Sequence, residues 1–309
     1  MMQHPTTRRR FLSHAGLSLA GLGLLGSHAA AVEPFKRPGA SRLRLSLAAY
    51  SFRQYFVHGG SRQTDAAAKR IDLIDFMDFC ADHDCEGAEL TSYYFPPEVT
   101  TDYLIKLRRH AFLRGLEISG TSVGNNFTLP PGPKLDAQIS SVKKWIGYAA
   151  IMGAPHIRIF AGGGQGMAQE EARKVCLAAM EECADEAGKH GIFLGLENHG
   201  GIVAQPAELL DLVKAVKSPW LGINLDTGNF STDDPYADLA LCAPYAVNVQ
   251  FKGELRRRGQ KAEPADLPRL VKMLRDANYQ GYVALEYESA EDPWKAVPDL
   301  LQRMKRSFS

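Results

Sequence analysis

Residues 192–200 read IFLGLENHG, an apolar run that ends in charged and polar side chains. Seven other short apolar runs share this design, at residues 43–52, 87–92, 116–123, 156–163, 220–228, 246–253 and 281–288. Stretches with helical periodicity separate them, at residues 66–84, 99–114, 135–152, 168–191, 206–217, 264–278 and 293–306, and a short helix near 236–243 fills the remaining interval. Eight strands that each precede a helix predict a single-domain (β/α)8 TIM barrel.

A doubly wound open sheet is the competing architecture. That fold usually carries a glycine-rich turn after its first strand, and residues 48–56, AAYSFRQYF, contain no such turn. The glycine cluster AGGGQG at 161–166 lacks the Lys-Ser/Thr ending of a phosphate-binding loop. We therefore interpret it as a flexible loop of the barrel.

The N-terminal residues differ from the rest of the chain. Arg8 and Arg9 precede an apolar, glycine-rich run and then small residues that end at Ala31. This pattern predicts a twin-arginine signal peptide over residues 1–31, followed by a barrel domain over 32–309. The implied partner is the twin-arginine translocase and the implied location is the bacterial periplasm. The apolar run is too short for a stable membrane span, although an uncleaved N-terminal anchor stays an alternative.

The composition is that of an ordinary globular protein. The 309 residues carry a formal net charge of +1, with 45% hydrophobic and 23% charged residues. Neither a basic stripe nor an interleaving of aromatic and basic residues is present, so we expect no nucleic-acid partner.

Polar residues gather where the predicted strands end, which is where TIM barrels place their chemistry. The last four strands provide Glu197, Asp226, Gln250 and Glu286. Three carboxylates at one mouth would repel one another and raise their pKa values unless a cation held them. Oxygen ligands suit a hard divalent ion such as Mn²⁺ or Mg²⁺, so the pattern predicts a metal site.

Several motifs resemble those of the xylose isomerase-like TIM barrels, the sugar phosphate isomerase/epimerase superfamily: GLENHGG, NLDTGN, VQFKG and ALEYE, with CEGAELT and HIRIFAGG. The resemblance covers nearly the whole chain after residue 31. It implies a site for Mn²⁺, Mg²⁺, Co²⁺ or Zn²⁺ with Glu197, Asp226, Gln250 and Glu286 as ligands. Gln250 stands where the family usually has His, and Asn229 stands where epimerases often have His, so the site departs from the family pattern at both positions.

The chemistry of an α-hydroxy ketone suggests further roles. Glu197 and Glu286 would move the proton, and Lys252 would neutralise the enolate charge. His199 is a candidate acid/base or hydroxyl contact. The candidate substrate-binding residues are Glu89, Arg158, Asn229 and Arg256, although Glu89 and Arg158 could instead pair in the core and Arg256 could be a solvated loop residue.

Three functions follow from this reading. The first is a metal-dependent isomerase or epimerase that acts on a carbohydrate through an enediolate. The second is a lyase that removes the same proton from a 3-keto glycoside and expels the C1 substituent. The third is a sugar-binding barrel without activity. The loops offer no clear phosphate cradle, which favours a neutral sugar over a phosphorylated one.

Overall fold

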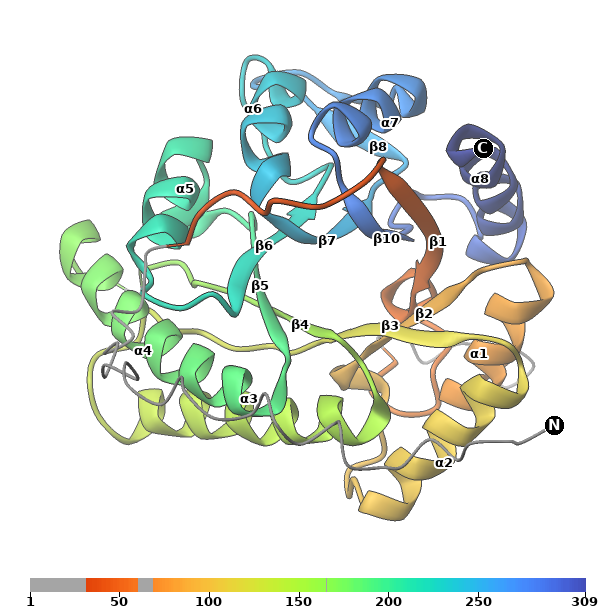
Figure 1. Ribbon diagram of the computed structural model, residues 1–309, viewed down its shortest axis with the longest axis horizontal. Coiled ribbons are helices and arrows are strands. Elements are labelled where there is room, and N and C mark those ends of the chain that lie inside the picture. The colour runs from red at the N-terminus through yellow and green to blue at the C-terminus, as the bar shows by residue number, and fades with distance from the viewer. Residues whose placement is uncertain (1–31, 61–68, 165) are drawn as a thin grey trace, which may run out of the picture.

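The computed structural model describes residues 32–60, 69–164 and 166–309. Eight parallel strands close into a barrel in the order β1, β2, β3, β4, β5, β6, β7 and β10, with β10 beside β1 (Figure 1). Their bounds are β1 Arg42–Ala48, β2 Gly87–Thr91, β3 Glu117–Ser122, β4 His156–Ile159, β5 Phe193–Glu197, β6 Leu221–Asp226, β7 Ala246–Phe251 and β10 Gln280–Leu285. The predicted (β/α)8 barrel is therefore confirmed, while the predicted signal peptide at 1–31 lies outside the described residues.

Among the described residues, eight α-helices surround the barrel (Figure 1). They are α1 Leu73–Asp82, α2 Thr101–Leu113, α3 Pro133–Met152, α4 Gln169–His190, α5 Pro206–Ala215, α6 Pro235–Cys242, α7 Leu267–Asp276 and α8 Pro293–Phe308. The short helix predicted near 236–243 is present as α6. Within the described part of the chain, no helix has both the length and the apolar character that crossing a membrane requires.

The start of α1 differs from the prediction of a helix over 66–84. Asp72 caps the helix by accepting hydrogen bonds from the backbone N–H groups of Ile74 and Asp75. Ile71, just before the cap, forms a parallel bridge with Phe56. Because an N-cap residue satisfies the first free N–H groups of a helix, α1 begins at Leu73 and not earlier. The helical prediction was wrong for residues 69–72.

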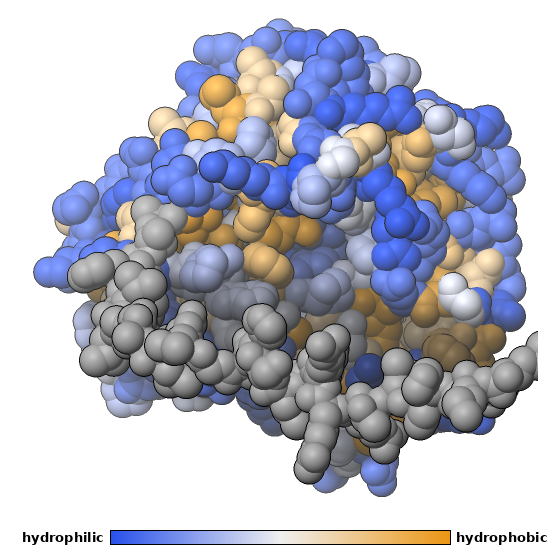
Figure 2. Space-filling view, in the orientation of Figure 1, coloured by the Kyte–Doolittle hydropathy of each residue, from blue (hydrophilic) through white to orange (hydrophobic). Residues whose placement is uncertain are grey.

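A β-hairpin that was not predicted follows β7. β8 (Glu254–Arg256) and β9 (Ala262–Pro264) pair antiparallel in the segment between β7 and α7. This hairpin stands beside the end of β7 and forms part of the wall of a cavity described below. The face seen in Figure 2 is mostly hydrophilic along its rim, whereas hydrophobic residues show chiefly between the helices and the strands.

The lumen of the barrel is polar. Asn248 of β7 donates a 2.9 Å hydrogen bond to Glu89 of β2, although β7 and β2 are not neighbours in the sheet. The hydroxyls of Ser46 and Ser119 lie 2.7 Å apart. TIM barrels usually fill this space with branched apolar side chains, so these polar groups must satisfy one another across the lumen.

Candidate active site

The predicted acidic residues do come together at the carboxyl ends of the strands. Glu197 ends β5, Asp226 ends β6 and Glu286 directly follows β10. All three are buried, with exposed fractions of 3%, 0% and 6%. Lys252 follows β7 and completes the group. A buried cluster of three carboxylates needs positive charge close by, and the structure supplies it from two sides.

Lys252 is the first of these charges. Its ammonium lies 3.4 Å from Oδ2 of Asp226 and 4.0 Å from Oε1 of Glu286, and it also pairs with Glu288. Burial alone would lower the pKa of Lys252, but the three carboxylates outweigh it and hold that pKa above its ordinary value. A Cβ on Gly228 would lie 2.7 Å from Cγ of Lys252, so this glycine makes room for the lysine stem.

Arg158 is the second charge, and it fixes Glu197. Nε of Arg158 lies 2.9 Å from Oε2 of Glu197, while Oε1 of Glu197 accepts a 2.9 Å hydrogen bond from Asn229. The guanidinium also donates to the carbonyl of Val123 at 2.7 Å and covers the ring of Phe160 at 3.9 Å. Arg158 therefore pairs with Glu197, and not with Glu89 as one reading of the sequence allowed.

Asp226 is held by its own backbone and by the neighbouring strand. Its Oδ1 accepts a 2.8 Å hydrogen bond from the N–H of Gly228. Asn198 bonds both backbone groups of Asp226, accepting from its N–H and donating to its carbonyl, each at 2.9 Å. Oδ2 of Asp226 is buried without a hydrogen bond among the described residues. This oxygen therefore stays free to interact with Lys252 or with a ligand.

Burial raises the pKa of the two glutamates at the site. Burial raises the pKa of Glu197 to about 7 despite the opposing charge of Arg158. Burial also raises the pKa of Glu286 well above its ordinary value, with Lys252 opposing the shift and Asp226 adding to it. Catalytic acids and bases work best when their pKa lies near the operating pH. Burial therefore brings the pKa of Glu197 close to neutral pH and favours the protonated form of Glu286.

Gln250 takes a different place from the one predicted for a metal ligand. Its Oε1 accepts a 2.7 Å hydrogen bond from Asn224, and its Nε2 donates to Oε1 of Glu89 at 2.6 Å. Asn248 closes the circle, because its amide donates to Oε2 of Glu89 at 2.9 Å and to Oδ1 of Asn224 at 2.8 Å. We call these four residues the amide ring. It lies in the lumen, and both ends of the Gln250 amide are used within it.

The sequence analysis missed Asn224 and Asn248. Each stands two residues before a predicted ligand on the same strand, Asp226 and Gln250 respectively. Successive inward-facing residues on a strand are two apart, so alternation could have identified both. Glu288, which also pairs with Lys252, is the last residue of the apolar run predicted at 281–288.

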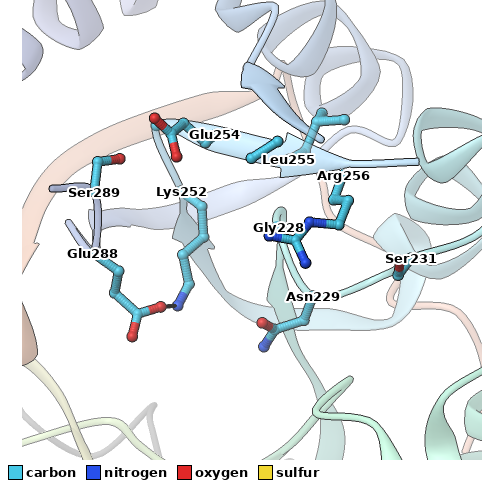
Figure 3. A pocket seen from close by; sticks show the side chains of 11 residues that line it. Gly228, Asn229, Ser231, Lys252, Glu254, Leu255, Arg256, Glu288 and Ser289 are labelled. Carbon is cyan, nitrogen blue, oxygen red and sulfur yellow. Dashed lines mark hydrogen bonds and ion pairs between the residues drawn. The ribbon is translucent and has the colours of Figure 1, made fainter. Parts of the chain in front are cut away.

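Cavities open at this end of the barrel, and two of them share Lys252. The first is lined by Tyr50, Tyr93, Arg158, Phe160, Glu197, His199, Asn229, Lys252, Glu286 and Glu288. The second is lined by Gly228, Asn229, Ser231, Lys252, Gly253, Glu254, Leu255, Arg256, Ala262, Glu288 and Ser289 (Figure 3). Asn229, Lys252 and Glu288 line both, so the two cavities form one continuous surface.

The remaining predicted residues divide between these cavities. His199 lines the first, with its ring 4.5 Å from that of Phe160, and burial lowers its pKa. Arg256 lines only the second and extends from β8 toward the side formed by Asn229 (Figure 3). Glu89 lies below both cavities, with an exposed fraction of 0%, in the amide ring. Glu89 is therefore not in direct reach of a substrate.

The side chains as they lie do not fit a divalent metal. Both oxygens of Glu197 are engaged, and the Gln250 oxygen is committed to Asn224. Asp226 and Glu286 have Lys252 beside them, and an ammonium repels a metal ion. Across residues 32–60, 69–164 and 166–309, no group of three or more His, Cys, Asp or Glu side chains is arranged to hold a metal ion.

The fold and this site define a class of protein. Residues 77–306 match the family described as xylose isomerase-like TIM barrel, which is most of the chain. The chain therefore belongs to the xylose isomerase-like TIM barrel family, as the motifs had indicated. A comparison with functionally curated proteins gave no match.

Solved structures of several other proteins are similar to this one. A 3-keto-D-glucoside 4-epimerase from E. coli is 15% identical, with a TM-score of 0.66 over 86% of this chain and 100% of that one. A D-psicose 3-epimerase from Clostridium cellulolyticum H10 is 13% identical, with a TM-score of 0.66 over 85% and 96%. The IOLI protein, solved with a zinc atom, is 16% identical, with a TM-score of 0.67 over 85% and 96%. At these identities the likeness establishes the fold.

Proposed function

We propose that this protein is a sugar isomerase or epimerase that transfers a proton next to a carbonyl through an enediolate. The arrangement that supports this most is the pair Glu197 and Glu286. Glu197 ends β5 and Glu286 follows β10, and β6 and β7 separate these strands in the barrel, so the two carboxylates reach one cavity from different sides. Membership of the family supports an enzyme that acts on a small carbohydrate.

The proton transfer uses groups of this chain. Glu197, oriented by Arg158 and Asn229, removes the proton from the carbon between the carbonyl and hydroxyl groups. The C–H electron pair moves into the new C=C bond, and the carbonyl electrons move onto oxygen. Glu286, whose pKa burial raises, returns a proton from the other side. Delivery to the opposite face of the same carbon re-forms the original carbonyl and gives epimerisation. Delivery to the neighbouring carbon, with the hydroxyl proton passing to the former carbonyl oxygen, gives isomerisation.

The metal stays a prediction from the resemblance. Mn²⁺ or Mg²⁺ would be preferred over Co²⁺ or Zn²⁺ by oxygen ligands. Because the side chains as they lie do not fit such an ion, no step of the proposal passes through one. Export to the periplasm is likewise part of the proposal and rests on residues 1–31 alone.

Exchange of substrate hydrogen with solvent tests the proposal. Purified protein is incubated with ketoses in D₂O and deuterium uptake at the carbon next to the carbonyl is followed by NMR. We expect uptake with the native protein and a loss of roughly 10²–10⁴-fold in Glu197→Gln and in Glu286→Gln, the usual contribution of a general acid or base. Glu171→Gln, an exposed glutamate on α4, is the matched control. Ketose binding without any exchange would leave the sugar-binding barrel as the function.

The lyase on 3-keto glycosides is the second candidate. The cavity beside Arg256 favours it, since this space adjoins the carboxylates and offers a place for a C1 substituent. A lyase would release the aglycone from a 3-keto glycoside, whereas an epimerase would return a glycoside with the aglycone still attached. Chromatography of the products separates the two.

A further inference from the structure

The amide ring removes one ligand from the metal site that the resemblance implies. Gln250 uses its oxygen to accept from Asn224 and its nitrogen to donate to Glu89. Turning the amide toward a metal would leave buried groups of Asn224 and Glu89 without this hydrogen-bond partner, which is unfavourable. The amide ring therefore stabilises Gln250 in an orientation that faces other side chains of the lumen.

Lys252 lies where the remaining ligands would need their cation. Its ammonium is 3.4 Å from Asp226 and 4.0 Å from Glu286, two of the three predicted carboxylate ligands. The lysine side chain is 12% exposed, so its charge acts in a setting with little solvent screening. Gly228 accommodates the lysine stem, since a Cβ there would lie 2.7 Å from its Cγ. The space beside Gly228, the amide ring and the nearby carboxylates are all consistent with this position of Lys252.

The third carboxylate has its own cation. Glu197 pairs with Arg158 at 2.9 Å and accepts a hydrogen bond from Asn229. With Arg158 on Glu197 and Lys252 beside Asp226 and Glu286, the acidic cluster is compensated by side chains of this chain. A divalent ion would have to displace at least one of these contacts.

We propose that Lys252 takes the place of the divalent metal in this protein. Its ammonium is the resident cation of the site, where it contacts the substrate carbonyl and hydroxyl oxygens and stabilises the charge of the enediolate. The inference rests on the proposed function for its substrate, and it adds that the proton transfer proceeds without a metal. Lys252 is then a catalytic residue, and Gln250 is a positioning residue that closes the lumen beneath it.

Metal binding is the first test, and it does not depend on activity. Full-length protein is treated with a chelator, dialysed and titrated with Mn²⁺, while free Mn²⁺ is followed by EPR. We expect no stoichiometric binding to the native protein or to Lys252→Arg, which keeps the charge. The double variant Gln250→His with Lys252→Met should bind Mn²⁺ at least about tenfold more tightly, because it gains an imidazole ligand and loses the competing cation. Lys174→Met, an exposed lysine on α4, is the matched control.

One equivalent of Mn²⁺ bound to the native protein, and lost in Asp226→Asn, would overturn the inference. Melting curves show whether each variant is folded. If the double variant does not fold, native protein and Lys252→Arg still decide the question, because stoichiometric Mn²⁺ binding by either contradicts it and its absence in both supports it.

Deuterium exchange is the second test. Native protein in excess chelator should retain its exchange rate, and Lys252→Met should lose roughly 10²–10³-fold, as when one donor to an oxyanion is removed. Exchange that requires added Mn²⁺ would refute the role of Lys252. Failure of exchange under both conditions would refute the proposed function instead, and the Mn²⁺ titration would still decide whether Lys252 replaces the metal.

Discussion

The ammonium of Lys252 lies 3.4 Å from Oδ2 of Asp226, a buried oxygen that accepts no hydrogen bond within the described residues. The contact joins the ends of two neighbouring strands, β6 and β7. Charges in such a dry position interact more strongly than they do at the surface. The same ammonium also lies 4.0 Å from Glu286, so Lys252 compensates two of the three buried carboxylates at the mouth.

The ion pair between Arg158 and Glu197 should be needed for the full free energy of unfolding. Both side chains are buried, with exposed fractions of 5% for Arg158 and 4% for Glu197. Arg158→Leu leaves the Glu197 carboxylate without its partner, so we expect the free energy of unfolding to fall by about 3–5 kcal/mol. Urea denaturation of this variant, with the exposed Arg109→Leu as control, measures the loss. The double variant Arg158→Leu with Glu197→Leu should recover much of it, and simple additivity of the two single losses would contradict the coupling.

Removing Gln250 from the amide ring should also lower the stability of the protein. Gln250→Leu removes the acceptor for Asn224 and one donor to Glu89. With two buried groups affected at about 1–3 kcal/mol each, we expect the free energy of unfolding to fall by about 2–6 kcal/mol. Urea denaturation is the measurement, and Gln169→Leu on the exposed start of α4 is the control. A loss no greater than that of the control would mean that the amide ring does not form.

His156 makes stability depend on pH. Burial lowers its pKa from 6.5 to about 4. The unfolded chain therefore binds more protons than the folded chain between these values, and stability rises with pH through this window. The contribution is fully present above about pH 6.5 and is lost as pH falls toward 4, with a total of about 3 kcal/mol.

Urea midpoints at pH 5 and pH 7.5 test this dependence. The native protein should lose more stability between the two values than His156→Gln does, because glutamine does not titrate. Equal pH dependence in both proteins would show that His156 stays uncharged for another reason or does not titrate in this range.

Two glycines provide a matched comparison of packing. A Cβ on Gly120 of β3 would lie 2.0 Å from Cε1 of His156, whereas a Cβ on Gly147 of α3 would meet nothing within 4 Å. We expect Gly120→Ala to destabilise the protein by about 1–3 kcal/mol or more. Gly147→Ala should stabilise it by about 0.5–1 kcal/mol, since alanine loses less backbone entropy in a helix. Thermal and urea unfolding measure both, and a tolerated Gly120→Ala would show that the imidazole can move aside.

Much of this protein could be predicted from its sequence. Apolar runs of strand length that alternate with helical periodicity predicted eight strands and their order, since strand and helix periods differ. The polar residue that ends each run predicted Glu197, Asp226, Glu286 and Lys252 at one mouth. Local signals were weaker at the start of α1, where Ile71 pairs with Phe56 in a bridge and Asp72 caps the helix. They were also weak in the hairpin of β8 and β9, because each strand has only three residues.

Only the tertiary structure decided which partners the polar side chains bind through their hydrogen bonds. The sequence by itself determined that Gln250 and Lys252 stand two residues apart at the end of one predicted strand. In the closed barrel, Nε2 of Gln250 lies 2.6 Å from Oε1 of Glu89, a residue 161 positions away in the sequence. The Gln250 amide therefore points into the lumen. The same closure left Lys252 among Asp226, Glu286 and Glu288. Partners this far apart in sequence leave no local pattern, because only the closed sheet fixes which strands face one another.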